Sequence, residues 1–86
     1  MRELILENYK ATESRGKIDT FTTHEHFVDK LYEELREVEN AESSEIELGK
    51  ELADVILTAM NYAYHYGIDI EQELYDKVEY NKTRKD

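Results

Sequence analysis

The sequence has no cysteine, no proline and only three glycines among its 86 residues. The absence of cysteine excludes disulfides, thiolate metal sites and a cysteine nucleophile, and it fits an intracellular protein. Residues that interrupt helices are scarce, whereas good helix formers such as Glu, Leu, Lys and Ala are abundant. We therefore expect an all-α protein, because nothing in the sequence indicates strands or long loops.

Long apolar runs are missing as well. Residues 1–8 are interrupted by charges and lack the continuous apolar segment of a signal peptide. The apolar stretch at residues 55–63 is interrupted by Thr58 and Asn61 and is far shorter than a membrane span. We expect no membrane partner and a cytoplasmic location.

Positive charge is in short supply. The chain has 11 Lys and Arg residues against 21 Asp and Glu residues, and its formal net charge is -10. This balance disfavours binding to a nucleic-acid backbone through a basic surface. We expect no nucleic-acid partner, and a small anionic ligand would need a metal ion between it and the protein.

Capping residues divide the chain into four expected helices. These cover residues 1–13, from Thr22 or Thr23 to 42, from Ser43 or Ser44 to 66, and residues 70–81. Ser44 stands three residues before Glu47, which is the spacing of a capping box, and Asp69 begins the last helix. Gly16 and Gly67 are the expected helix stops, since glycine adopts the left-handed conformation at low cost.

Apolar side chains repeat at helical intervals, so each helix has a face that we expect to be buried. These residues are Phe27, Leu31, Leu35 and Val38, then Leu48, Leu52, Val55, Ile56, Ala59 and Ala63, and finally Leu74 and Val78. The second and third helices then form an antiparallel helical hairpin on which the additional helices pack. One domain over residues 1–86 has a small core, so we expect a four-helix bundle completed by oligomerisation, in a homodimer or homotetramer.

Two pairs of acidic residues share one spacing. Glu34 and Glu37 lie one turn apart on the second helix, and Glu51 and Asp54 repeat this spacing on the third. The 13 residues between the pairs suffice to turn the chain, so the pairs would face each other across the hairpin. Four facing carboxylates repel unless a cation lies among them, and oxygen ligands favour magnesium or manganese. Spacing alone favours four solvated side chains, because this spacing occurs by chance in any Glu-rich helix.

The acidic motifs resemble those of a known family. Glu33-Glu34-x-x-Glu37 followed by Glu51-x-x-Asp54 is similar to the signature of the MazG-like all-α nucleoside triphosphate pyrophosphohydrolases. The resemblance continues through the apolar helix after Asp54, the break at residues 67–69 and the motif Lys77-x-x-x-Asn81-x-x-Arg84. It covers roughly residues 27–85.

The resemblance implies roles for these residues. Glu34, Glu37, Glu51 and Asp54 would be the magnesium ligands, with manganese as an alternative. Glu33 would be a further ligand through water or the base that orients the attacking water, so Glu33 and Glu34 are the implied catalytic residues. Substrate phosphates or sugar would contact Lys77, Asn81 and Arg84, although Lys77 equally fits a solvated charge near a helix end.

The reaction implied by the resemblance converts a nucleoside triphosphate and water into the monophosphate and pyrophosphate. Its implied task is the removal of noncanonical or excess nucleotides. Two alternatives remain open at this point. One is phosphoribosyl-ATP pyrophosphohydrolase, a similarly short relative, and the other is a non-enzymatic acidic helical interaction module.

The remaining polar and aromatic residues support further expectations. Asn61 continues the face of Asp54 on the third helix, together with Thr58, and is a candidate for binding base or sugar. We expect His65 at the surface near a helix end, and His24 and His26 in solvent at a helix start. Packing explains Tyr62, Tyr64 and Tyr66, whereas the candidates for stacking a base are Phe21, Phe27 and Tyr32.

Overall fold

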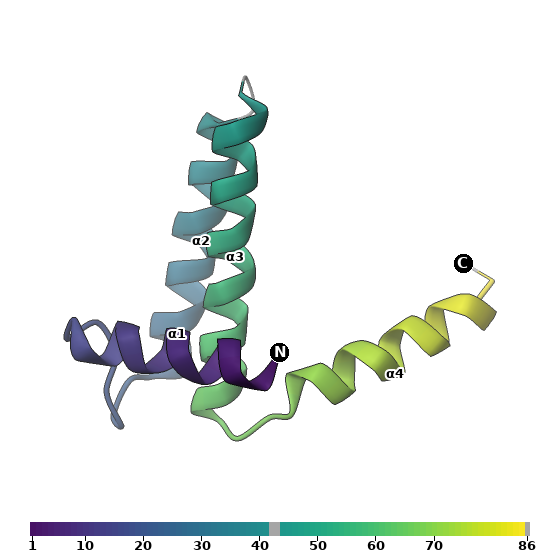
Figure 1. Ribbon diagram of the computed structural model, residues 1–86, viewed down its shortest axis with the longest axis horizontal. Helices are drawn as coiled ribbons and strands as arrows, with labels where there is room; N and C mark the ends of the chain where they lie inside the picture. Colours follow the sequence, from purple (N-terminus) through teal and green to yellow (C-terminus); the bar gives the residue numbers. More distant parts are fainter. Residues whose placement is uncertain (42–43, 86) are drawn as a thin grey trace.

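The computed structural model describes residues 1–41 and 44–85. Within these ranges the chain forms four helices and no strand (Figure 1). The helices are α1 (Arg2–Ser14), α2 (His24–Asn40), α3 (Glu45–His65) and α4 (Ile70–Thr83). The expected all-α class is therefore confirmed.

Side-chain caps begin three of the helices where the sequence predicts them. The Thr23 hydroxyl accepts a hydrogen bond from the His26 N–H at 3.2 Å. The Ser44 hydroxyl accepts one from the Glu47 N–H at 3.3 Å, and the Asp69 carboxylate accepts one from Gln72. Two expectations, a helix end at Glu42 and a cap at Ser43, lie outside the described residues.

Two helices end at glycines in the left-handed conformation. Gly16 follows α1 with φ 73°, and Gly67 follows α3 with φ 70°. In each case the next residue reaches back to the helix: the Lys17 N–H donates to the Thr12 carbonyl, and the Ile68 N–H donates to the Ala63 carbonyl. This is the Schellman arrangement, and it confirms the predicted helix stops.

The helices α2 and α3 lie side by side as an antiparallel hairpin, and α1 crosses one end of it (Figure 1). The core lies at this end. It contains Tyr9 of α1, Ile18 of the connection and Phe27 of α2, with Tyr62 of α3 packed against them. Phe27 is only 2% exposed. The folded centre thus depends on α1, which covers the end of the hairpin away from its turn.

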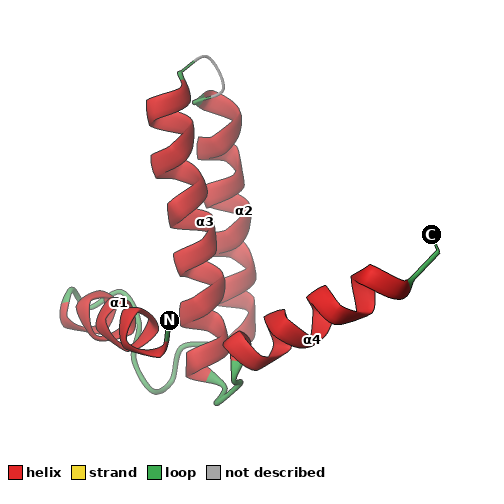
Figure 2. Ribbon diagram, turned by 45° about the vertical axis from the view of Figure 1, so that its right-hand side comes forward, coloured by secondary structure: helices red, strands yellow, loops and turns green. Residues whose placement is uncertain are grey.

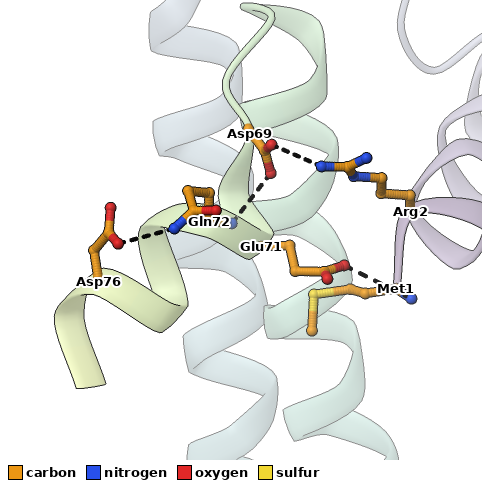
Figure 3. Close-up of polar contacts among 6 residues, drawn as sticks. All are labelled: Met1, Arg2, Asp69, Glu71, Gln72 and Asp76. Carbon is orange, nitrogen blue, oxygen red and sulfur yellow. Dashed lines mark hydrogen bonds and ion pairs between the residues drawn. The ribbon is translucent and has the colours of Figure 1, made fainter. Parts of the chain in front are cut away.

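The last helix leaves the hairpin instead of lying along it (Figure 2). Its start is tied to α1 by an ion pair between Arg2 and Asp69 at 3.1 Å and by a second between the N-terminal amino group and Glu71 at 3.9 Å (Figure 3). Both pairs are partly or largely exposed, so their contribution to stability is small.

Several residues expected in the core are exposed in the single chain. The prediction of burial is wrong there for Leu35, Leu52, Ile56, Ala59, Leu74 and Val78. The reason is geometric: among the described residues no third helix covers the half of the hairpin near its turn, and α4 meets the rest of the chain near its start, at α3 and the start of α1. Separately, no helix among the described residues is both long and apolar enough to cross a membrane.

Candidate metal centre and adjoining pocket

Three of the four predicted metal ligands converge. Glu34 of α2 and Glu51 and Asp54 of α3 each place a carboxylate oxygen within 4.8 Å of the other two. The hairpin brings them together because both acidic pairs occur on the facing sides of α2 and α3. Glu37 lies outside this group of three, although its negative charge contributes to the raised pKa of Glu51.

The electrostatics of the cluster are unfavourable without a cation. Loss of hydration raises the pKa of Glu51, and the negative charges of Asp54, Glu37 and Glu34 raise it further. A carboxylate that resists ionisation beside other carboxylates gains from a bound metal ion, which reverses the sign of the local field. The side chain of Glu34 is only 12% exposed, so part of this charge is sheltered from water.

A lysine lies beside the cluster. The Lys30 ammonium is 3.1 Å from Glu34 and 3.5 Å from Glu33, one turn along the same helix. Burial lowers the pKa of Lys30, but the two carboxylates outweigh this and raise it overall. Lys30 therefore stays charged and partly balances the cluster, and it competes with any metal ion for Glu34.

The cluster borders a pocket of about 530 Å³ between α1, α2 and α3. This volume is typical of sites that hold small organic ligands. Glu33, Glu34 and Asp54 contribute the acidic part of its lining, and Ile18, Phe27 and Leu57 contribute an apolar part. A ligand in this pocket would have carboxylates at one side and a hydrophobic surface at another.

An amide network forms another wall of the pocket. Asn61 is 7% exposed, and its side-chain oxygen accepts a hydrogen bond from the Asn8 amide at 3.0 Å. The Asn61 amide donates to the Thr12 hydroxyl at 3.2 Å, and this hydroxyl donates to the Asn8 carbonyl. Asn61 does line the pocket, as its helical position indicates, and α1 holds its orientation.

Sequence reasoning missed the contribution of α1 and its following turn. Asn8, Thr12, Arg15 and Lys17 line the pocket, as does Lys30. The contact of Lys30 with Glu34 was predictable from the sequence, because Lys30 precedes Glu34 by one helical turn. The α1 residues carry no such signal, since their place depends on how α1 crosses the hairpin.

The C-terminal residues of the predicted substrate site lie elsewhere in the chain. Lys77 and Asn81 belong to α4, Arg84 follows its last turn, and α4 points away from the hairpin (Figures 1 and 2). Lys77 lies over the Tyr80 ring at 5.3 Å. None of these residues lines the pocket. A single chain therefore does not bring them to the acidic cluster.

The histidine and aromatic expectations are partly corrected. His65 is half-buried, contrary to prediction: its Nε2 donates to the Thr22 carbonyl and its Nδ1 bonds the Tyr9 hydroxyl, both at 2.8 Å. It thus fastens α1 and the α1–α2 connection to α3. Phe27 belongs to the core and stacks on Tyr62, which argues against stacking a base.

His24 and His26 are exposed as expected, and His24 bonds the Tyr62 hydroxyl. Phe21 and Tyr32 are exposed, and neither lines the pocket.

Comparisons with protein-family models, with curated proteins and with solved structures found no match for this chain. The resemblance to the MazG-like family therefore depends on the motifs, and the site must be interpreted from its own geometry.

Proposed function

We propose that this chain is a magnesium-dependent nucleoside triphosphate pyrophosphohydrolase of the MazG-like type. The observation that carries the proposal is the convergence of Glu34, Glu51 and Asp54 beside a pocket large enough for a nucleotide. Acidic side chains alone would repel a triphosphate. Carboxylates placed to hold a divalent cation instead give the triphosphate a binding partner.

The donor set suits the proposed ion. Every candidate ligand is a carboxylate oxygen, and oxygen ligands are those that magnesium and manganese prefer. Glu34, Glu51 and Asp54 would hold the ion, and Glu37 is the fourth candidate from the neighbouring turn. When bound, magnesium lowers the pKa of water and neutralises charge that develops on phosphate oxygens.

The residues around the cluster have separate roles in this proposal. Glu33 lines the pocket beside Glu34, and it accepts a proton from the attacking water. The water oxygen forms a bond to phosphorus at the α–β bridge, the bridging P–O bond breaks, and pyrophosphate leaves. Asn61 has a fixed orientation and contacts the sugar or base, which orients the nucleotide for this attack.

The proposed enzyme is an oligomer. The chain exposes 6799 Å², whereas a compact protein of 10.2 kDa exposes about 5,300 Å². Its radius of gyration is 14.4 Å, against about 12 Å for a compact chain of this length. An excess of roughly 1,500 Å² per chain is ample for a stable interface between two copies.

A second copy also accounts for the two parts of the site that one chain keeps apart. The apolar residues Leu52 and Ile56 on the hairpin and Leu74 and Val78 on α4 are exposed and need a covering surface. If α4 of one copy packs on the hairpin of another, it adds a third helix to that hairpin and covers these residues. The phosphates of a bound substrate can then be contacted by Lys77, Asn81 and Arg84 of that copy.

A product assay tests this proposal. The chain is incubated with magnesium and a panel of common and oxidised nucleoside triphosphates, with phosphoribosyl-ATP as a separate substrate. We expect equal amounts of monophosphate and pyrophosphate from at least one nucleoside triphosphate. Activity confined to phosphoribosyl-ATP would favour that alternative. No pyrophosphate from any substrate would contradict the enzymatic function and favour an interaction module.

A further inference from the structure

The pocket is bordered by positive charge in a chain that has little of it. Three of the 11 basic residues line it: Arg15, Lys17 and Lys30. Lys30 is paired with Glu33 and Glu34. Among the described residues, the side chains of Arg15 and Lys17 have no hydrogen bond or ion pair within the chain. These two cations are therefore available to an anionic ligand.

A backbone turn determines the positions of Arg15 and Lys17. They flank Gly16, whose φ of 73° is one that side-chain-bearing residues rarely adopt. The Gly16 N–H donates to the Glu13 carbonyl at 2.9 Å, and the Lys17 N–H donates to the Thr12 carbonyl at 3.2 Å. A closed turn at a helix end therefore holds both residues beside the pocket, and binding does not require the turn to be ordered first.

The formal charges of the Lys, Arg, Asp and Glu residues that line the pocket cancel before any ion binds. Arg15, Lys17 and Lys30 are positive, and Glu33, Glu34 and Asp54 are negative. A divalent cation at the acidic cluster would make this lining net positive, which suits a polyphosphate. Phosphate groups would then lie between the metal ion on one side and the turn after α1 on the other.

From this arrangement we infer that Arg15 and Lys17 bind the polyphosphate of the nucleotide, in the same chain that supplies the acidic cluster. The inference rests on the proposed function for the identity of the ligand. It adds a substrate-binding element, the turn after α1, that the acidic and C-terminal motifs do not contain. The arginine guanidinium and the lysine ammonium both donate charge-assisted hydrogen bonds to phosphate oxygens.

Direct binding of inorganic tripolyphosphate, measured by calorimetry with magnesium present, tests the inference without requiring catalysis. In Arg15→Gln/Lys17→Gln we expect the affinity to fall at least about 10-fold, as for the loss of charge-assisted contacts. A charge-preserving variant, Arg15→Lys/Lys17→Arg, should stay within about threefold of the wild type. The matched control, Lys10→Gln/Arg36→Gln, removes two exposed charges outside the pocket and should leave the affinity unchanged.

The outcomes separate this inference from the proposed function. Equal affinities in the wild type and Arg15→Gln/Lys17→Gln, or no binding by the wild type, would overturn the role of the turn. If the wild type still releases pyrophosphate from nucleotides in that case, the proposed function stands. If Arg15→Gln/Lys17→Gln binds tripolyphosphate more weakly than the wild type but the wild type hydrolyses no nucleotide, the anion site is supported and the enzymatic function is contradicted.

Discussion

At the scale of single residues, the central feature is a set of carboxylates that destabilise one another. Glu51 illustrates the cost, because lost hydration and the charges of Asp54, Glu37 and Glu34 all raise its pKa. Ionised Glu51 in this arrangement disfavours the folded state. The arrangement is explained if a cation is part of the working protein, since metal binding then returns stability to the folded state.

The first prediction concerns Glu51→Gln. Without magnesium this variant should unfold roughly 1–3 °C above the wild type, because one repelling charge is removed. Magnesium should raise the unfolding temperature of the wild type and raise that of Glu51→Gln less. The control is Glu39→Gln, an exposed change on α2 outside the cluster. Equal magnesium responses in all three proteins would show that Glu51 holds no ion.

The second prediction follows from the direction of the Glu51 pKa. Its ordinary value is 4.5, and the folded state raises it, so the folded state binds more protons between that value and the raised one. Without metal, the contribution of Glu51 to stability therefore falls as pH rises through this window. Urea unfolding from pH 4 to 7 should show the advantage of Glu51→Gln over the wild type growing with pH. An advantage that does not change with pH would argue against the shift.

The sequence predicted part of this site. Helical spacing placed Glu34, Glu51 and Asp54 correctly, because residues three apart share a helix face and a short connection returns the chain antiparallel. The pairing of His65 with Tyr9 and Thr22 was missed. It joins residues more than 40 positions apart, and no local pattern reports such a contact.

At the scale of helices, local hydrogen bonds determine where each helix ends, whereas the packing of the whole chain determines which apolar side chains are buried. Thr23, Ser44 and Asp69 begin helices, and Gly16 and Gly67 end them, as the sequence predicts. Helix caps depend on hydrogen bonds between residues a few positions apart, so they can be predicted from the local sequence. Apolar spacing identified the faces of α3 and α4 but did not show that one chain leaves much of those faces uncovered.

The third prediction compares a glycine that follows α3 with a glycine inside it. Gly67→Ala places a Cβ at φ 70°, so the free energy of unfolding should fall by about 1–2 kcal/mol. Gly49→Ala lies within α3 with open space around the new Cβ, so the free energy should rise by about 0.5–1 kcal/mol. Urea unfolding measures both. Changes of the same sign would contradict the assigned helix end.

At the scale of the whole molecule, the chain is extended and leaves many apolar side chains exposed. The crossing of α1 creates the pocket, whereas α4 extends away from the hairpin and exposes its apolar residues (Figure 2). Neither feature follows from periodicity, because periodicity gives the faces of helices and not the angles at which they pack. The short length of the chain predicts oligomerisation. The exposed apolar residues of α3 and α4 are where we propose that a second copy binds.

The fourth prediction is that Leu52→Lys/Ile56→Lys sediments as a monomer, whereas the wild type sediments as a dimer or tetramer. Charges on these neighbouring turns of α3 would prevent packing of an apolar partner surface. The control variant Glu3→Gln/Glu7→Gln changes the net charge by the same amount on exposed positions of α1. A monomeric wild type, or an unchanged oligomer in Leu52→Lys/Ile56→Lys, would contradict the proposed interface.

The proposed magnesium-dependent hydrolysis is tested by the rate of pyrophosphate release from nucleoside triphosphates by Glu34→Gln and by the wild type, each with and without magnesium. The side chain of Glu34 is only 12% exposed, and Glu34 is the member of the three-residue cluster that comes from α2. We predict magnesium-dependent release by the wild type, about 100-fold or greater loss in Glu34→Gln, and little change in Glu39→Gln. No release by the wild type, or equal rates in Glu34→Gln and the wild type, would contradict the account.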